Sequence, residues 1–227
     1  MTITAVLVDG GFYRKRARFL FGKVGPEERA KELVKYCSLH LRDTDNDVPR
    51  HLYRIFYYDC PPVNRNVYNP LLKRTINLGM SATYDWTLRF YKALTAQRKV
   101  AIRMGRISNE TGYRLKAESF KKLCAGTLDI SQLTTENDLA LEFGQKGVDM
   151  RLGLDIAHLA YKRLVNQVVL ISGDSDFVPA AKMARREGID FILDPMGIPI
   201  ADDLSEHIDG LRSHYRDYLN AKAEPQS

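Results

Sequence analysis

Two aspartates stand two residues apart where an apolar run of the chain ends. Val168-Val169-Leu170-Ile171 leads directly into Ser172-Gly173-Asp174-Ser175-Asp176. An unbroken run of valine, leucine and isoleucine predicts a strand buried on both faces, as in parallel sheets. The turn after such a strand is where open α/β sheets bind ligands. Carboxylates gathered there repel one another unless a cation lies between them, and a divalent cation is the usual answer.

Other aspartates are expected at the same edge of the sheet. Asp9 follows a predicted first strand, residues 3–8, and Asp149 is predicted to be a helix N-cap. If the strands 3–8 and 167–172 are neighbours, their aspartates face each other across roughly 5–10 Å, because paired strands lie about 4.8 Å apart. A right-handed crossover starts the Asp149 helix near this edge. We therefore predict one acidic cluster that binds Mg²⁺ or Mn²⁺ and is catalytic: Asp9, Asp149, Asp174 and Asp176.

Phosphodiester hydrolysis is the chemistry that suits this cluster. A bound divalent ion lowers the pKa of a water molecule and neutralises charge on an in-line transition state. Each aspartate also has a structural alternative, because an aspartate after a strand often only shapes a turn or caps a helix. We assign that role to Asp59 and Asp194. Asp155 lies about 120° round the helix from Asp149, so we predict either metal contact or a salt bridge for it.

The elements that position these residues alternate between strands and helices. We predict strands at 3–8, 51–58, 100–107, 167–172 and 189–193, and the main helices at 26–41, 70–97, 150–164 and 178–187. This order predicts an α/β fold, a three-layer Rossmann-like, mostly parallel sheet with helices on both faces.

The middle of the chain is the least regular part of the sequence. Alternating residues at 100–107 predict a half-exposed edge strand, and residues 113–116 are predicted to pair with it as a hairpin. A short helix is expected at 117–124. We predict a single domain over residues 1–215, with an irregular insertion at about 105–143 and a flexible tail at 216–227.

Charge is distributed unevenly along the 227 residues. Residues 1–125 hold 24 basic and 11 acidic residues, a net of +13, whereas residues 126–227 hold 10 and 17, a net of −7. A basic half beside an acidic half favours a polyanion-binding surface next to a cation-binding centre. We predict that nucleic acid is bound by Arg14, Lys15, Arg16, Arg18, Lys73, Arg74 and Lys146. Candidates for base stacking are Tyr13, Tyr57, Tyr58 and Trp86.

Composition indicates a globular protein of the cytoplasm. Hydrophobic residues make up 44% of the chain, and no apolar run approaches the roughly 20 residues of a membrane span. The N-terminus has the pattern of a first strand and not of a signal peptide. Three widely spaced cysteines favour free thiols in a reducing compartment.

Three blocks of the sequence carry a resemblance to a known family. They are Val6-Leu7-Val8-Asp9-Gly10, Lys146-Gly147-Val148-Asp149 with Asp155 six residues on, and Ile171 to Pro179. Together they resemble the NYN domain of the LabA-like branch of the PIN-like nuclease superfamily. The resemblance implies a PIN-like sheet, RNA as substrate and Mg²⁺ or Mn²⁺ at Asp9, Asp149, Asp174 and Asp176, with Asp155 as a weaker match. The family commonly has Asp-Gly-x-Asn after the first strand, whereas Gly10-Gly11-Phe12 follow Asp9 here.

Three functions follow from these observations, in order of preference. The first is a metal-dependent ribonuclease acting on single-stranded RNA, without a membrane partner and with a homodimer left open. The second is a catalytically weak or inactive RNA-binding or regulatory protein on the same fold. The third, a phosphatase, lacks the Asp-x-Asp nucleophile motif that it requires after the first strand.

Overall fold

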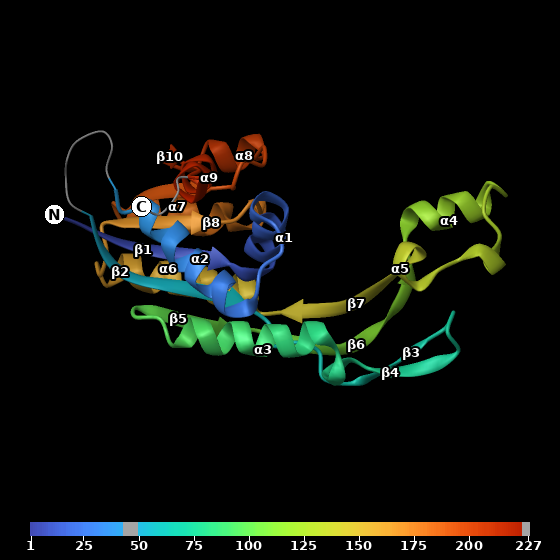
Figure 1. Ribbon diagram of the computed structural model, residues 1–227. Helices are drawn as coiled ribbons and strands as arrows, with labels where there is room; N and C mark the ends of the chain where they lie inside the picture. Colours follow the sequence, from blue (N-terminus) through green and yellow to red (C-terminus); the bar gives the residue numbers. More distant parts are fainter. Residues whose placement is uncertain (43–49, 224–227) are drawn as a thin grey trace. The chain divides into compact units, whose positions relative to one another are not determined.

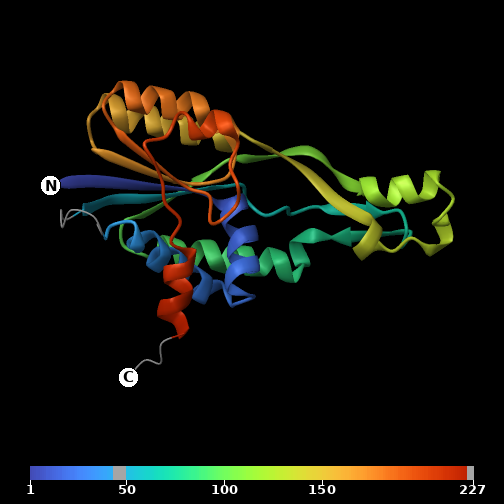
Figure 2. The same ribbon diagram turned by 90° about the horizontal axis from the view of Figure 1, so that it is seen from above.

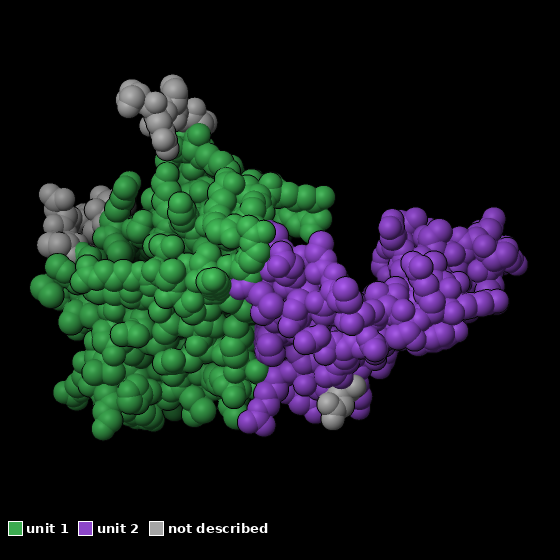
Figure 3. Space-filling model, turned by 60° about the horizontal axis from the view of Figure 1, so that its bottom comes forward, with its two compact units in different colours: residues 1–59, 89–105, 147–227 green, residues 60–88, 106–146 purple. Residues whose placement is uncertain are grey.

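The computed structural model describes residues 1–42 and 50–223, and the chain divides into two compact units. The first unit comprises residues 1–59, 89–105 and 147–227, and the second comprises residues 60–88 and 106–146 (Figure 3). The insertion predicted at 105–143 falls almost wholly in the second unit, together with residues 60–88.

A six-stranded parallel sheet forms the centre of the first unit (Figure 1). Its strands lie side by side in the order β10-β9-β8-β1-β2-β5, and every neighbouring pair is parallel. Numbered along the chain, this is the 3-2-1-4-5-6 order of doubly wound sheets. The strands are β1 (Thr2–Asp9), β2 (Arg50–Asp59), β5 (Val100–Met104), β8 (Gln167–Ile171), β9 (Asp190–Asp194) and β10 (Gly210–Leu211).

Helices cover both faces of this sheet, which confirms the predicted three-layer α/β fold. Figure 2 shows α6 and α7 on one face and α1, α2 and α9 on the other. Successive side chains of β2 point to opposite faces of the sheet. The Tyr57 hydroxyl lies against Gly10 of α1, and the Tyr58 hydroxyl bonds Asp155 of α6. The helices are α1 (Gly10–Phe21), α2 (Pro26–Leu39), α6 (Val148–Tyr161), η3 (Ser175–Phe177), α7 (Val178–Arg186), α8 (Asp202–Ser205) and α9 (Tyr215–Ala223).

Apolar strand residues explain why β1 and β8 lie at the centre. Ala5 to Val8 and Val168 to Ile171 are each at most 1% exposed. Strands that present apolar side chains on both faces are stable only where helices cover both faces. The predicted strand at 167–172 is therefore confirmed as a central strand of a parallel sheet.

The second unit consists of two antiparallel strand pairs and short helices. The pairs are β3 with β4 and β6 with β7. The helix α3 begins in this unit and ends in the first. The elements are β3 (Asn66–Asn69), β4 (Arg74–Asn77), η1 (Leu78–Met80), α3 (Ala82–Thr95), β6 (Arg106–Leu115), α4 (Ala117–Cys124), η2 (Ile130–Gln132), α5 (Thr135–Asp138) and β7 (Leu139–Lys146).

Two predictions for this region are wrong. The helix predicted at 70–97 forms only as the short η1 and as α3. Residues 70–77 instead turn after β3 and form β4, with Lys73 in the left-handed region at φ 51°. The hairpin of 100–107 with 113–116 does not form. β5 instead pairs with β2 in the parallel sheet, and residues 106–115 pair with the strand 139–146, which the sequence analysis did not predict. The short helix at 117–124 is confirmed.

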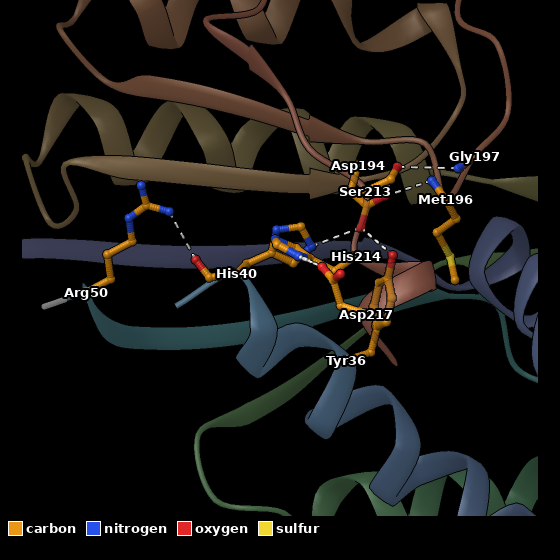
Figure 4. A network of polar contacts seen from close by, with 9 residues as sticks. All are labelled: Tyr36, His40, Arg50, Asp194, Met196, Gly197, Ser213, His214 and Asp217. Atoms are coloured by element: carbon orange, nitrogen blue, oxygen red, sulfur yellow. Dashed lines mark hydrogen bonds and ion pairs between the residues drawn. The ribbon is translucent and has the colours of Figure 1, made fainter. Parts of the chain in front are cut away.

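A buried aspartate at the end of β9 holds the segment before α9 in place. Tyr36 and His40 bond Oδ2 of Asp194, at 2.6 and 2.9 Å, and Ser213 and the Met196 N–H donate to Oδ1, both at 2.7 Å (Figure 4). Asp194 is fully buried. The network ties the segment before α9 to α2. The helix α9 includes residues 216–223 of the region predicted as a tail, and residues 224–227 lie outside the described residues.

This network makes stability depend on pH. Burial alone raises the pKa of Asp194, but hydrogen bonds from His40, Tyr36 and Ser213 outweigh it and hold the pKa below its ordinary value of 3.8. Burial lowers the pKa of His40 below 6.5, more than Asp194 raises it. Both groups thus bind fewer protons in the folded chain than in the unfolded chain. The stability that they contribute is complete above pH 6.5 and is lost on acidification.

We expect the free energy of unfolding to fall as the pH drops below 6.5, and again below 3.8. Denaturant titrations at a series of pH values measure this dependence. In His40→Gln the decrease that starts near pH 6.5 should be reduced, because the group that takes up the proton is gone. An unchanged pH profile in this variant would contradict the assignment.

Candidate functional site

Asp9 lies at the point where the strand order of the sheet reverses. It is the last residue of β1, and β1 pairs with β2 on one side and with β8 on the other. Its Oδ1 accepts a hydrogen bond from the Phe12 N–H at 3.1 Å, so Asp9 is also the N-cap of α1. Ligands of doubly wound sheets bind at this switch point. Asp9 therefore caps a helix and also stands at the place where a ligand of such a sheet would bind.

The loop after β8 is joined to Asp9 through Ser172. The Ser172 hydroxyl donates to Oδ2 of Asp9 at 3.4 Å and accepts from the Asp174 N–H at 3.3 Å. Asp174 in turn accepts from the Asp176 N–H at 3.0 Å. Ser172 is fully buried, whereas both aspartates of the loop are exposed. The sequence analysis did not predict a role for Ser172. Its place directly after the predicted strand, as a small residue with a hydroxyl group, could have indicated one.

Asp149 reaches this loop from the start of α6. The N-cap of α6 is Gly147, with φ 76°, so the prediction that Asp149 is the cap is wrong. Glycine adopts this left-handed conformation without strain. Asp149 instead stands in the first helical turn, and α6 contacts η3, the turn that contains Asp176.

The pKa shifts show which of these carboxylates lie within electrostatic reach of one another. Burial raises the pKa of Asp9, and the charges of Asp149 and Asp59 raise it further, against the hydrogen bonds from Phe12 and Ser172. Burial also raises the pKa of Asp149, followed by the charges of Asp174 and Asp176. Like charges shift a pKa only when they are near. The expected cluster of four aspartates is thus electrostatically connected.

Asp59, assigned a turn role from the sequence, is a buried neighbour of the cluster. It ends β2, is 1% exposed, and adds to the negative field at Asp9. Arg14 forms an ion pair with it at 2.9 Å, and the Tyr57 hydroxyl donates to it at 3.1 Å. A buried carboxylate requires such partners. The burial of Asp59 could not be recognised from its position before Cys60 and two prolines.

Asp155 has the salt-bridge role that the sequence analysis left open. Its Oδ2 accepts from the Tyr58 hydroxyl at 2.8 Å and from Arg103 Nε at 2.9 Å. These contacts tie α6 to β2 and β5.

The predicted nucleic-acid-binding residues occupy different environments. On α1, Lys15 and Arg18 are exposed, Arg14 faces Asp59, and Arg16 donates to the Met196 carbonyl at 2.8 Å. Three others belong to the second unit, where they are exposed: Lys73, Arg74 and Lys146.

Three of the four candidates for base stacking are not accessible. Tyr13, Tyr57 and Tyr58 are fully buried, and each hydroxyl is hydrogen-bonded within the protein. The prediction that they stack on bases is therefore wrong. Trp86 is half-buried. Local sequence does not show whether an aromatic side chain packs in the core or lies at the surface.

In the described part of the chain, no three or more histidine, cysteine, aspartate or glutamate side chains are placed to hold one metal ion together. Carboxylate oxygens are nevertheless the donors that hard cations prefer. Mg²⁺ is commonly bound by one or two carboxylates, with water and substrate phosphate completing its coordination. The donor type and the excess negative charge of the cluster fit such an ion.

Comparison with models of protein families matches residues 83–201 to the NYN domain. This range is just over half of the chain. The chain belongs to the NYN domain family. NYN domains group with PIN-like nucleases, and the matched range includes Asp149, Asp174 and Asp176. The predicted membership is therefore confirmed at the level of the NYN domain.

Solved structures and curated proteins were also compared with the chain. A protein of unknown function from Vibrio parahaemolyticus is similar over 93% of this chain and 92% of its own, with 11% identity and a TM-score of 0.47. No curated protein matches the chain.

The proximity of the acids is testable by titration. Asp149→Asn should lower the pKa of Asp9, and Asp174→Asn should lower the pKa of Asp149, because each change removes a like charge. NMR titration of the carboxyl carbons measures both values. Asp217→Asn, which removes an exposed carboxylate bonded to His214, serves as the control and should leave both unchanged. Equal pKa values in all proteins would show that the acids are too far apart to interact.

Close packing at Gly10 gives a second prediction. A Cβ atom at Gly10 would lie 2.5 Å from the Tyr57 ring, whereas at Gly11 the nearest atom is Asp9 Oδ1 at 3.4 Å. Gly10→Ala should lower the free energy of unfolding by about 1–3 kcal/mol, as overpacked sites do. Gly11→Ala should be neutral or stabilising, because alanine favours helix. Denaturant unfolding of the two variants compares them; equal stability would contradict the contact.

Proposed function

We propose that this NYN protein is a metal-dependent ribonuclease of the LabA-like branch, which hydrolyses RNA phosphodiester bonds at Asp9, Asp149, Asp174 and Asp176. The observation that carries the proposal is the electrostatic convergence of these acids at the switch point of the parallel sheet. The family is one of nucleases, and acids grouped at this place in a doubly wound sheet suit a phosphate ligand accompanied by a cation.

One or two carboxylates of the cluster would hold Mg²⁺ or Mn²⁺, with water and substrate phosphate as the other ligands. Asp149, Asp174 and Asp176 are exposed and can reach an ion from solvent. The Asp9 carboxylate is held by hydrogen bonds from the Ser172 hydroxyl and the Phe12 N–H. A bound ion would supply neutralising charge for the phosphate and would lower the pKa of a coordinated water. Fixed donors to Asp9 keep its carboxylate in one orientation before substrate arrives, which reduces the reorganisation needed during reaction.

The chain's own residues would bind the ion and keep the acids in place. Burial and the like charges of Asp174 and Asp176 raise the pKa of Asp149, so a cation bound beside this carboxylate would relieve that repulsion. Ser172 keeps Asp9 and the Asp174 loop at a fixed distance. Removal of either feature should affect turnover more than RNA affinity.

Single-stranded RNA is the proposed substrate, with its backbone bound by basic residues. α1 begins at Asp9, so the exposed Lys15 and Arg18 stand on the helix that starts at the acids. On the second unit, Lys73, Arg74 and Lys146 are exposed and are proposed to contact RNA phosphates there.

None of the helices in the described ranges has the length and apolar character of a membrane span. Free thiols at Cys37, Cys60 and Cys124 support a cytoplasmic location.

A second candidate is an RNA-binding protein with weak or absent catalysis. The observation in its favour is Phe12, which stands after Gly10-Gly11 where the family pattern places Asn. The phenyl ring lies so close to Gly173 that a Cβ there would be 2.9 Å from it. An apolar ring therefore lies beside the Asp174 loop, where an amide would otherwise orient a water or the substrate.

Cleavage of labelled single-stranded RNA with Mn²⁺ separates the two candidates. We expect Asp174→Asn and Asp149→Asn to lower kcat/KM by at least about 100-fold, since even residues that only support metal ligands contribute 10–100-fold. The control Glu187→Gln removes the same charge from an exposed position at the end of α7 and should retain activity. RNA binding that persists in every variant without any cleavage would favour the second candidate.

A further inference from the structure

The Arg14 guanidinium lies against Asp59, the last residue of β2, and β2 is the neighbour of the strand that ends at Asp9. Arg14 lies on α1, five residues after Asp9, and its Nη2 contacts both carboxylate oxygens of Asp59, at 3.1 and 2.9 Å. The side chain of Asp59 is 1% exposed and that of Arg14 is 27% exposed. One end of the pair is thus buried in the core, and the other end reaches solvent.

The position of Asp59 is itself fixed by the core. The Tyr57 hydroxyl lies 3.1 Å from Oδ2 of Asp59 and 3.3 Å from the Gly10 carbonyl. Tyr57 is fully buried, and its ring occupies the space that a Cβ at Gly10 would fill. Asp59 therefore has little freedom to move, and Arg14 is held with it.

Arg14 retains unused hydrogen-bond capacity. Among the described residues its contacts are with Asp59 through Nη2, which leaves Nε and Nη1 without a protein acceptor. Guanidinium N–H groups in this state are suited to phosphate oxygens. Arg16, two residues on, is directed instead to the Met196 carbonyl, and Lys15 and Arg18 point to solvent.

The charge of Arg14 also interacts with an acid of the candidate site. Burial opposes its charge, but the pKa of Arg14 is raised overall by Tyr57 and Asp59 and also by Asp9. Arg14 thus lies in the field of the same Asp9 that belongs to the acidic cluster. An anion bound at the cluster would bring a phosphate close to this guanidinium.

We propose that Arg14 binds the phosphate at the acidic cluster and stabilises its charge during cleavage, and that Asp59 and Tyr57 are the positioning residues of Arg14. This inference rests on the proposed ribonuclease function. It separates Arg14 from Lys15 and Arg18, which would bind the RNA backbone and contribute to affinity alone. A fixed cation is effective because it requires no reorganisation when charge develops on the phosphate.

The test removes both members of the ion pair together. Arg14→Met alone would leave Asp59 buried without its partner and is prone to unfold. Arg14→Met combined with Asp59→Asn removes both charges of this ion pair and keeps the net charge of the protein. Thermal unfolding establishes that this double variant is folded. Arg18→Met, on the same helix and exposed, is the matched control.

Steady-state cleavage of single-stranded RNA with Mn²⁺ then decides the role. We expect kcat of the double variant to fall about 100-fold, and Arg18→Met to change KM by a few-fold while retaining kcat. Arg14→Lys should also lose at least about tenfold in kcat, because an ammonium group lacks the planar fork of arginine. A folded double variant with wild-type kcat would overturn the proposal and leave the pair a structural salt bridge. If the double variant does not fold, wild-type kcat in Arg14→Lys overturns it.

Equilibrium RNA binding keeps the inference testable if the wild-type protein does not cleave RNA, an outcome that would reject the proposed function by itself. A phosphate contact by Arg14 predicts that the slope of log affinity against log salt concentration decreases by about 0.7 in the double variant, as for one contact to single-stranded nucleic acid. Its net charge is unchanged, so a general charge effect cannot produce this decrease. An unchanged slope would overturn the proposal.

Discussion

Parallel pairing of β1 with β8 determines where the acidic residues of this NYN protein meet. The register pairs Val8 with Ile171, so the next residue of each chain segment, Asp9 and Ser172, lies at the same edge of the sheet. These two strands are consecutive in the sheet but are separated by more than 150 residues in the chain. The strand order reverses between them, so the first helix after each strand covers a different face of the sheet. Doubly wound sheets bind their ligands at such a place.

Electrostatic repulsion among the carboxylates is the cost of this arrangement. Asp9 and Asp149 are both shifted towards the protonated form, by burial and by neighbouring acids. The fold offsets part of this with donors, namely the Phe12 N–H and the Ser172 hydroxyl at Asp9. It also places Arg14 on the neighbouring Asp59. The remaining negative charge is what favours a divalent cation in the proposed function.

Aspartates at the ends of strands differ according to what covers them. Asp194 ends β9 and is surrounded by donors from Tyr36, His40 and Ser213, so its charge is satisfied and it serves stability. Asp59 is equally buried but has an arginine partner that reaches solvent. Asp174 and Asp176 are exposed. The same residue type in the same topological position is thus enclosed by donors, paired with one arginine or exposed to solvent, depending on the residues around it.

The amino-acid sequence by itself determined five of the six strands of the central sheet, and it placed Asp9 and Asp174 at the ends of two of them. Continuous apolar runs such as Val168 to Ile171 need cover on both faces, and this requirement allows few folds other than a parallel α/β sheet. Tertiary structure alone decided features that depend on distant partners. β6 pairs with a strand that begins more than 20 residues after it ends, and no local pattern encodes that contact. Burial of Tyr57, Asp59 and Asp194 likewise arises only when helices pack on the sheet, because local sequence does not specify which side of a strand a helix will cover.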